Sequence, residues 1–290
     1  MNVCAGIILY NPDIQRLKEN IEAILPQVEH LVLVDNFSGN IEEVQKEFKN
    51  KHIIWIKNGE NRGIAAALNQ LIDFASKNSY EWILTLDQDS ICEEDLVEKL
   101  LVHAMGDDKI AMAAPLVIDR GISETVTKKG KTRANSEEIK MCISSGSLTN
   151  VEAVRETGGF DEWLFMYDVD REICIRLLRK GYKLIRVNIT KLYHEHGLKT
   201  VTRRFLWKKI VYRNYSPTSV YYMTRNLLYM LRKYGKEYSP SPFLRRVRMY
   251  IAFIIKFIFE PNRLQRLKSF SKGVKEGKAA DINETREVSV

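Results

Sequence analysis

The chain has 290 residues, 45% hydrophobic and 28% charged, with a formal net charge of +8. This composition excludes a disordered chain and is sufficient for one large core, or for a catalytic domain with a smaller appendage. The four cysteines lack the paired spacing of a zinc site, and no charged-then-apolar leader precedes the first apolar run, so we expect a cytoplasmic protein.

The positive charge is concentrated in the last third of the chain. Residues 198–278 contain 20 Lys and Arg against 3 Asp and Glu, whereas residues 1–197 contain 24 against 31. The apolar stretch 249–259 is interrupted by Lys256 and is shorter than the roughly 20 residues that span a bilayer. We expect this segment to lie as an amphipathic helix on an anionic membrane surface or, as the alternative, to pack against the rest of the protein.

Apolar runs alternate with amphipathic segments along the first 118 residues. Strands are expected at 3–9, 30–35, 52–57, 82–87 and 110–118, and helices at 13–25, 40–49, 63–75 and 93–104. This alternation predicts an α/β fold with a mostly parallel central sheet and helices on both faces.

Further elements are expected after this alternating region. They are a returning strand with a bend at 139–150, a short helix at 151–160, a helix from Asp170 to Lys180 ending at Gly181, and a strand at 182–187. The basic tail from about residue 198 has a helical pattern, broken by Pro217, Pro240, Pro242 and Pro261.

A polar cluster follows each of the first four predicted strands: "YNPD", "DNFSGN", "NGENRG" and "DQDS". Parallel strands present their carboxyl ends at one edge of the sheet, where ligands bind in such folds. The four clusters should therefore form one site.

Asp87 and Asp89 stand at the end of the fourth predicted strand. Two carboxylates at this spacing can share a hard divalent cation that keeps open positions for phosphate oxygens. Two alternatives remain open: a phosphatase with Asp87 as nucleophile and Asp89 as acid, or carboxylates that cap the helix starting near Glu93.

The other clusters suit a nucleotide. Asp35 can accept a hydrogen bond from the ring N–H of uracil or thymine, and Tyr10 with Asn11 can form the wall beside the base. A helix N-terminus and a guanidinium group suit ribose and phosphate. They are provided by Asn61, Arg62 and Gly63.

Seven segments in this order resemble glycosyltransferase family 2, and two of them, "NRGIAAALNQ" and "LDQDS", resemble its bacterial rhamnosyltransferase members. The segments are "ILYNPD", "VLVDNFSGN", "NGENRGIAAALNQ", "LTLDQDS", "SSGSLTN", "GGFDEWLFMYDVDREICIRLLRKGY" and "HEHG", within residues 3–230. The resemblance implies a GT-A fold, a nucleotide-diphospho-sugar donor, Mg²⁺ or Mn²⁺ as cofactor, and inversion at the anomeric centre. It also adds Asn69 and Gln88 to the expected nucleotide-sugar site.

The resemblance implies a catalytic domain at 1–200 and a basic helical region at 201–290. The nucleotide-sugar half of the domain is expected at about 1–118 and the acceptor half at about 139–200.

The family's general base is an aspartate at the start of a helix, upstream of an arginine. Counting back from Arg176, Asp170 takes that position, with Glu172 as the next acidic residue. The usual acidic residue before the base is replaced by Val169, so Asp168 remains an alternative.

Relatives carry a histidine before a glycine that reaches the metal or the diphosphate. In "LYHEHG" the candidates are His194 and His196, which alternate onto one face of an extended segment. On the acceptor side we expect Ser145 and Gly146, with Trp163 as an aromatic face for a sugar ring or as a core residue.

The expected function is transfer of L-rhamnose from dTDP-L-rhamnose, or of another sugar from a UDP-sugar, to a polysaccharide or lipid-linked saccharide. The enzyme would associate peripherally with the inner face of the cell membrane, and self-association is a further expectation. The alternative of another class is a nucleic-acid-binding protein that uses the basic tail.

Overall fold

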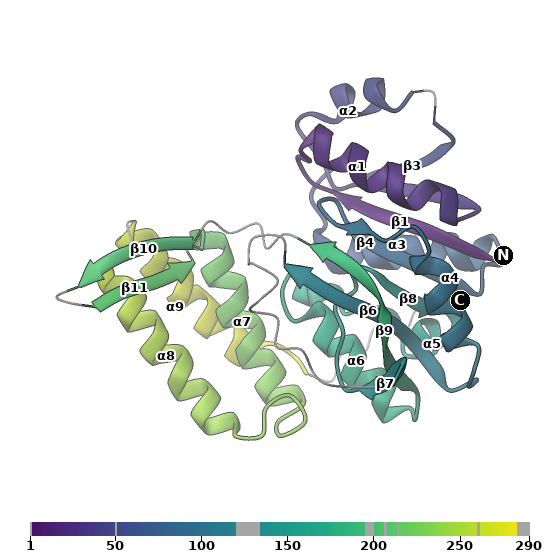
Figure 1. Cartoon of the computed structure of the whole chain (residues 1–290). Coiled ribbons are helices and arrows are strands. Elements are labelled where there is room, and N and C mark those ends of the chain that lie inside the picture. Colours follow the sequence, from purple (N-terminus) through teal and green to yellow (C-terminus); the bar gives the residue numbers. More distant parts are fainter. Residues whose placement is uncertain are drawn as a thin grey trace. The chain divides into compact units, whose positions relative to one another are not determined.

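The computed structural model describes residues 2–49, 51–119, 134–194, 200–205, 208–213, 215–259 and 262–282 (Figure 1). The chain divides into two compact units. The first contains Met1–Phe165 and Val169–Glu195, and the second contains Met166–Asp168 and His196–Thr285.

The first half of the main sheet is parallel. It consists of β1 (Val3–Leu9), β2 (His30–Asp35), β3 (Ile53–Lys57) and β4 (Trp82–Asp87) in the order β3-β2-β1-β4 (Figure 1). The connecting helices are α1 (Ile14–Ile24), α2 (Ile41–Glu47) and α3 (Gly63–Lys77), with a 3-10 turn at Leu25–Gln27 after α1. The predicted Asp13 start of the first helix is confirmed, because the Asp13 carboxylate accepts a hydrogen bond from the N–H of Arg16.

The second half of the sheet mixes parallel and antiparallel pairs. Its strands are β5 (Ile91–Cys92), β6 (Ile110–Asp119), β7 (Ser136–Ile139), β8 (Ser147–Asn150) and β9 (Lys183–His194). β8 is antiparallel to β4 and β6, β6 is parallel to β9, and β9 is antiparallel to β5 and β7. The helices here are α4 (Leu96–Ala104), α5 (Val151–Glu156) and α6 (Val169–Arg179), with a 3-10 turn at Glu162–Leu164.

Helices cover two faces of the sheet, as the alternation of apolar runs predicts. Side chains of a strand alternate between faces. The odd-numbered residues of β1 share a buried core with Leu17 and Ile21 of α1. On the opposite face, an added Cβ at Gly6 would overlap the side chain of Leu71, so α3 lies directly against β1. The predicted α/β fold class is confirmed.

The carboxyl ends of the first four strands lie at one edge of the sheet. In the registers of these strands, Leu9 pairs with Asp35, Asp35 with Lys57, and Ile8 with Asp87. The polar clusters after these strands therefore converge on one edge, as predicted.

The second unit is part sheet and part helix. A two-stranded antiparallel sheet of β10 (Thr200–Phe205) and β11 (Lys208–Arg213) precedes α7 (Pro217–Lys233), α8 (Pro242–Phe259) and α9 (Arg263–Ala279). The prediction of a helical tail from residue 198 is therefore wrong for its first part, where β-branched residues such as Val201 and Val211 favour strands. Among the described residues, no helix combines the length and the apolar character needed to cross a membrane.

Candidate functional site

Asp87, Asp89 and His194 form the centre of the candidate site in the first unit. Each offers one ligand atom, and these atoms lie within 4.8 Å of one another. β4 delivers Asp87 at its last residue, and the antiparallel pairing of Ile91 with Tyr193 brings the end of β9 beside the turn that carries Asp89. His194 Nδ1 lies 3.7 Å from Asp89 Oδ1, and the side chains of His194 and Asp89 are 12% and 26% exposed.

Two serine hydroxyl groups hold this cluster in place. The Oγ of Ser145 accepts a hydrogen bond from the main-chain N–H of Asp87 at 2.9 Å and lies 2.8 Å from the Oγ of Ser90. The Ser90 Oγ in turn lies 2.9 Å from Nδ1 of His194. This network fixes the imidazole ring, as partners of ligand side chains do in metal sites.

The electrostatics of the cluster favour a cation. Burial, and to a smaller extent the charges of Asp170 and Asp89, raise the pKa of Asp87 to about 7. Two carboxylates and an imidazole are competent ligands for Mg²⁺ or Mn²⁺. A bound divalent cation would offset the repulsion between these carboxylates, so the residues present fit the expected metal.

Asp170 lies beside this cluster. It stands in the first turn of α6, and its Oδ1 accepts a hydrogen bond from the main-chain N–H of Ser144 at 3.0 Å. Burial raises the pKa of Asp170, while the bond from Ser144 and the charge of His194 act in the opposite direction. The carboxylate is therefore held by one main-chain bond and is a stronger base than an exposed aspartate.

Asp168 and Glu172 have other partners. The Asp168 carboxylate accepts a hydrogen bond from the hydroxyl of Tyr238 at 2.9 Å, within the second unit. Glu172 is fully buried and accepts charge-assisted bonds from the guanidinium of Arg176 at 2.9 and 2.6 Å. A buried carboxylate paired in this way is a structural element of α6.

The residues predicted to bind the base lie where β1 and β2 end. Asp35 is 3% exposed and accepts a bond from the N–H of Ser38 at 3.1 Å. Tyr10 is 50% exposed, and its main-chain N–H and C=O both bond to the side-chain amide of Gln88. Asn11 has a positive φ of 47° and accepts a bond from the N–H of Gly39. Gln88 thus orients the main chain at Tyr10.

Asn36 was not among the predicted site residues, yet it organises the loop before α3. The Asn36 side chain is buried, donates to the carbonyl of Gly63 at 3.0 Å and accepts from the N–H of Arg62 at 2.9 Å and from the Asn58 amide at 3.2 Å. The signal for it was its place in "DNFSGN", directly after Asp35.

The main-chain N–H groups at the start of α3 are already bonded. The N–H of Gly63 bonds to Asn61 Oδ1, and the N–H groups of Ile64 and Ala65 bond to the carbonyl of Phe165. These N–H groups are therefore not available to a phosphate, and the prediction that this helix N-terminus binds phosphate through them is wrong. The guanidinium of Arg62 lies 3.8 Å from Glu162, and the Arg62 side chain is 45% exposed, so it is still accessible to a phosphate group.

The structure also places Asn69 and the residues predicted on the acceptor side. The Asn69 side chain bonds both the N–H and the C=O of Phe160. Gly146 has a φ of 79°, and an added Cβ would lie 2.7 Å from Leu192. Trp163 lies in the 3-10 turn after Asp161. His196 is outside the described residues.

Two family models match the chain. The model described as "Glycosyl transferase family 2" matches residues 4–158, and that described as "Glycosyl transferase family group 2" matches residues 82–260.

Two curated proteins are similar in sequence. The "dTDP-rhamnosyl transferase RfbF" of Shigella flexneri is 30% identical over 251 residues, which cover 80% of each chain. An uncharacterised glycosyltransferase of Methanocaldococcus jannaschii is 26% identical over 223 residues, which cover 66% of this chain and 76% of the other.

Solved structures share the fold at low sequence identity. GalNAc-T7, solved with UDP, GalNAc and Mn²⁺, gives a TM-score of 0.60 at 15% identity. This alignment covers 94% of the present chain and 56% of GalNAc-T7, so the chain spans little more than half of that protein. The mannosyltransferase PcManGT of Pyrobaculum calidifontis, solved with GDP-Man and Mn²⁺, gives a TM-score of 0.57 at 12% identity. This alignment covers 95% of the present chain and 84% of PcManGT. At these low identities, the two structural similarities show only that the fold is shared.

Proposed function

This chain belongs to glycosyl transferase family 2, and we propose that it transfers L-rhamnose from dTDP-L-rhamnose to a saccharide acceptor by metal-assisted direct displacement with inversion. The chain is a glycosyltransferase. The choice of donor is supported by its 30% identity over 80% of the chain to a protein named as a dTDP-rhamnosyl transferase.

The observation that carries the mechanism is the cluster of Asp87, Asp89 and His194 at the carboxyl end of β4. In the proposal these three side chains hold Mg²⁺ or Mn²⁺, with His196 as a further candidate. When bound, the cation supplies charge stabilisation to the departing diphosphate. Ser90 and Ser145 orient the ligands through the hydroxyl network.

Asp170 is the proposed general base. In an inverting displacement the acceptor hydroxyl loses its proton as its oxygen forms a bond to the anomeric carbon, while the bond from that carbon to the diphosphate breaks. Asp170 takes the proton, because its carboxylate lies in the first unit close to Asp87 and its pKa is raised toward working pH. Asp168 remains the alternative, but its carboxylate is engaged by Tyr238.

The nucleotide is proposed to bind where β1, β2 and α3 meet. Asp35 accepts the hydrogen bond from the thymine ring N–H, Tyr10 and Asn11 line the base, and Arg62 meets phosphate. Further residues of this proposed site are Asn69, Asp87 and Gln88, and the bond between Asn61 and Gly63 shapes the turn that carries Arg62. On the acceptor side the proposal places Ser145, Gly146 and Trp163.

The acceptor is proposed to be a polysaccharide or lipid-linked saccharide at the inner face of the cell membrane. This is supported by the charge of the second unit, where residues 198–278 contain 20 basic against 3 acidic residues. Such a segment is attracted to anionic lipid.

The test measures by mass spectrometry the nucleoside diphosphate that is released from each member of a panel of dTDP-sugars and UDP-sugars. Each donor is tested with Mg²⁺, with Mn²⁺ and with EDTA. We expect metal-dependent turnover of dTDP-L-rhamnose. Turnover of a UDP-sugar alone would overturn the donor assignment. Release of inorganic phosphate from simple phosphate esters would instead favour a phosphatase, and salt-sensitive RNA binding without any nucleotide-sugar turnover would favour the nucleic-acid-binding alternative.

A further inference from the structure

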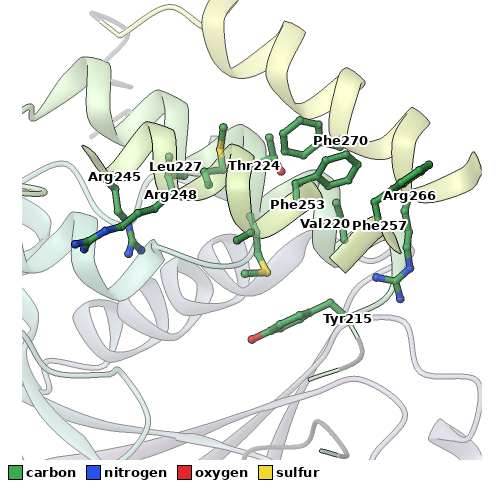
Figure 2. Close-up of a pocket in the computed structure, with 13 residues that line it drawn as sticks. Tyr215, Val220, Thr224, Leu227, Arg245, Arg248, Phe253, Phe257, Arg266 and Phe270 are labelled. Atoms are coloured by element: carbon green, nitrogen blue, oxygen red, sulfur yellow. The ribbon is translucent and has the colours of Figure 1, made fainter. Parts of the chain in front are cut away.

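The second unit contains an apolar pocket that the proposed function does not use. Its volume is about 270 Å³, close to the lower limit of about 300 Å³ for small-ligand pockets (Figure 2). Residues of α7, α8 and α9, together with Tyr215, line it. The apolar lining consists mainly of Val220, Met223, Leu227, Met249, Phe253 and Phe270.

The three helices around the pocket pack on one another in two ways. α7 and α9 approach closely, since an added Cβ at Gly273 would lie 2.7 Å from the carbonyl oxygen of Tyr221. α8 instead meets α9 through aromatic rings, with Phe253 stacked on Phe270 at a centroid distance of 3.8 Å (Figure 2). Side chains of α7, α8 and α9 line the apolar space that remains among the three helices.

Arginines lie at the edge of this apolar space. Figure 2 shows Arg245 and Arg248 at one end of the pocket and Arg266 at the other. Arg245 and Arg248 are three residues apart on α8 and therefore lie on one helix face. No carboxylate of the described residues pairs with either guanidinium group, and both side chains are exposed.

The surroundings of the pocket suit a membrane surface. Residues 242–275 contain nine basic residues and one acidic residue. Large apolar side chains of α8 are exposed to solvent, including Phe243 at 71%, Ile251 at 50% and Ile254 at 58%. A helix with exposed apolar side chains and arginines but no acid in its first turns is typical of interfacial helices.

We propose that this pocket binds one hydrocarbon chain of an anionic membrane lipid, and that Arg245 and Arg248 bind its phosphate group. An apolar chain replaces water against the aromatic and methionine side chains, which is favourable in proportion to the apolar area buried. Two guanidinium groups on one helix face give charge-assisted bonds to phosphate oxygens. The inference deepens the proposed membrane association and does not depend on which sugar is transferred.

The first experiment uses the full chain and soluble probes below their micelle concentration. Isothermal titration would compare decyl phosphate, decanol and inorganic phosphate. We expect saturable binding of decyl phosphate, at least tenfold weaker binding of decanol, and no measurable binding of inorganic phosphate. Equal binding of inorganic phosphate would overturn the role of the apolar pocket, and absence of saturable decyl phosphate binding would overturn the proposal.

Variants separate the pocket from general surface charge. The double variant Arg245→Gln/Arg248→Gln should weaken decyl phosphate binding about tenfold or more, because it removes both charged donors. Arg246→Gln is the matched control, an exposed arginine of the same helix turn that does not line the pocket. It should change affinity less than twofold. An equal effect of both substitutions would overturn the assignment of the phosphate site.

Met223→Trp fills the pocket from α7 and should abolish decyl phosphate binding while the circular dichroism spectrum is kept. Should this variant unfold, Leu227→Phe gives a smaller increase in volume at the same lining. Retained binding in a folded, filled variant would contradict the proposal.

Flotation with phosphatidylcholine vesicles, with and without phosphatidylglycerol, tests whether the protein binds an anionic membrane. Wild-type protein should float only with the anionic vesicles, and Met223→Trp should float less. Turnover of soluble nucleotide sugar should be unchanged in Met223→Trp, so failure here is distinguishable from failure of the proposed activity.

Discussion

The carboxylate of Asp170 is held by the main-chain N–H of Ser144 at 3.0 Å. This bond positions the proposed base without neutralising it, and burial raises its pKa. We expect Asp170→Asn to lower kcat by about 10²- to 10⁴-fold, because general base catalysis contributes on that order.

The KM for the nucleotide sugar should stay within about twofold, since Asp170 acts on the acceptor and not on donor binding. Product formation followed by mass spectrometry gives both constants. Asp168→Asn is the control and should keep most of the activity, because an asparagine can still accept the bond from Tyr238. The reverse result would move the base to Asp168.

The metal cluster predicts that Asp89→Asn weakens Mn²⁺ binding by about tenfold or more, because a charged oxygen ligand is replaced by a neutral one. Free Mn²⁺ measured by electron paramagnetic resonance reports the affinity without any assay of activity. EDTA should abolish turnover and added Mn²⁺ should restore it. The control is Asp95→Asn. Asp95 lies directly before α4, and its side chain is 49% exposed and pairs with Lys99. Unchanged affinity in Asp89→Asn would exclude it as a ligand.

The raised pKa of Asp87 predicts a pH dependence of metal binding. The pKa is raised from 3.8 to about 7, so the carboxyl group takes up a proton as pH falls through 7 and competes with the cation. Mn²⁺ affinity should therefore be nearly constant above pH 8 and fall by up to about tenfold per unit below pH 7. A titration of free Mn²⁺ between pH 5.5 and 8.5 measures it. A flat profile would show that Asp87 does not limit binding.

The raised pKa of Asp87 also predicts how the stability of the metal-free protein depends on pH. In the metal-free protein the folded state binds this proton more tightly than the unfolded state, so the contribution of Asp87 to folding is lost as pH rises from about 4 to 7. Added Mn²⁺ should restore stability most strongly at high pH. Thermal unfolding with and without Mn²⁺ at several pH values tests this.

Much of the parallel half of the fold follows from local patterns in the sequence. The runs 30–35 and 82–87 are apolar and end in polar residues, and both occur as strands with those bounds. The convergence of their ends follows because parallel strands share a direction. The strands at the start of the basic tail were harder to predict. The alternation of β-branched and basic residues at 200–213 is a weaker signal than the helical pattern that follows it.

His194 and Ser145 were candidates from the family resemblance, but their contacts with Asp89 and Ser90 could not be derived from local sequence patterns. His194 reaches Asp89 because β5 pairs with β9, a contact between residues about 100 positions apart. The hydroxyl link from Ser145 to Ser90 depends in the same way on a long-range pairing, that of β8 with β4. Such contacts depend on sheet order, which a single sequence specifies only through tertiary packing.

We expect replacement of Asn36 to weaken binding of the nucleotide-sugar donor. Its side chain joins the loop before α3 to the end of β2 through bonds to Arg62 and Gly63. Asn36→Ala leaves these buried main-chain groups without their partners, so we expect a loss of about 1–3 kcal/mol in unfolding free energy. The KM for the nucleotide sugar should rise more than kcat falls, because Arg62 loses its position.

Steady-state kinetics and urea unfolding measure the two effects of Asn36→Ala separately. Asn78→Ala at the end of α3 is the matched control, since its amide bonds one carbonyl at an exposed position. An Asn36→Ala protein with normal KM would contradict the proposed role of this loop in donor binding.

We expect replacement of Asn226 on α7 to lower kcat, because this side chain holds the segment that leads to α6. Its amide donates to the carbonyls of Met166 and Tyr167 at 2.6 and 3.0 Å, and the chain enters α6 two residues later. Tyr167 and Asp168 both have φ near 60°, a conformation that costs about 1–3 kcal/mol per residue and persists only when other contacts hold it. Removing the amide by Asn226→Leu should let this segment relax and displace the start of α6, where Asp170 stands.

We therefore expect Asn226→Leu to lower kcat about tenfold or more, with the KM for the donor unchanged and the pH profile of kcat shifted, because the surroundings of the base change. Asn226→Gln keeps the donor group and should recover part of kcat. A purely structural role would lower the unfolding temperature of both variants without moving the pH profile. That result would show that the 166–168 segment does not position the base.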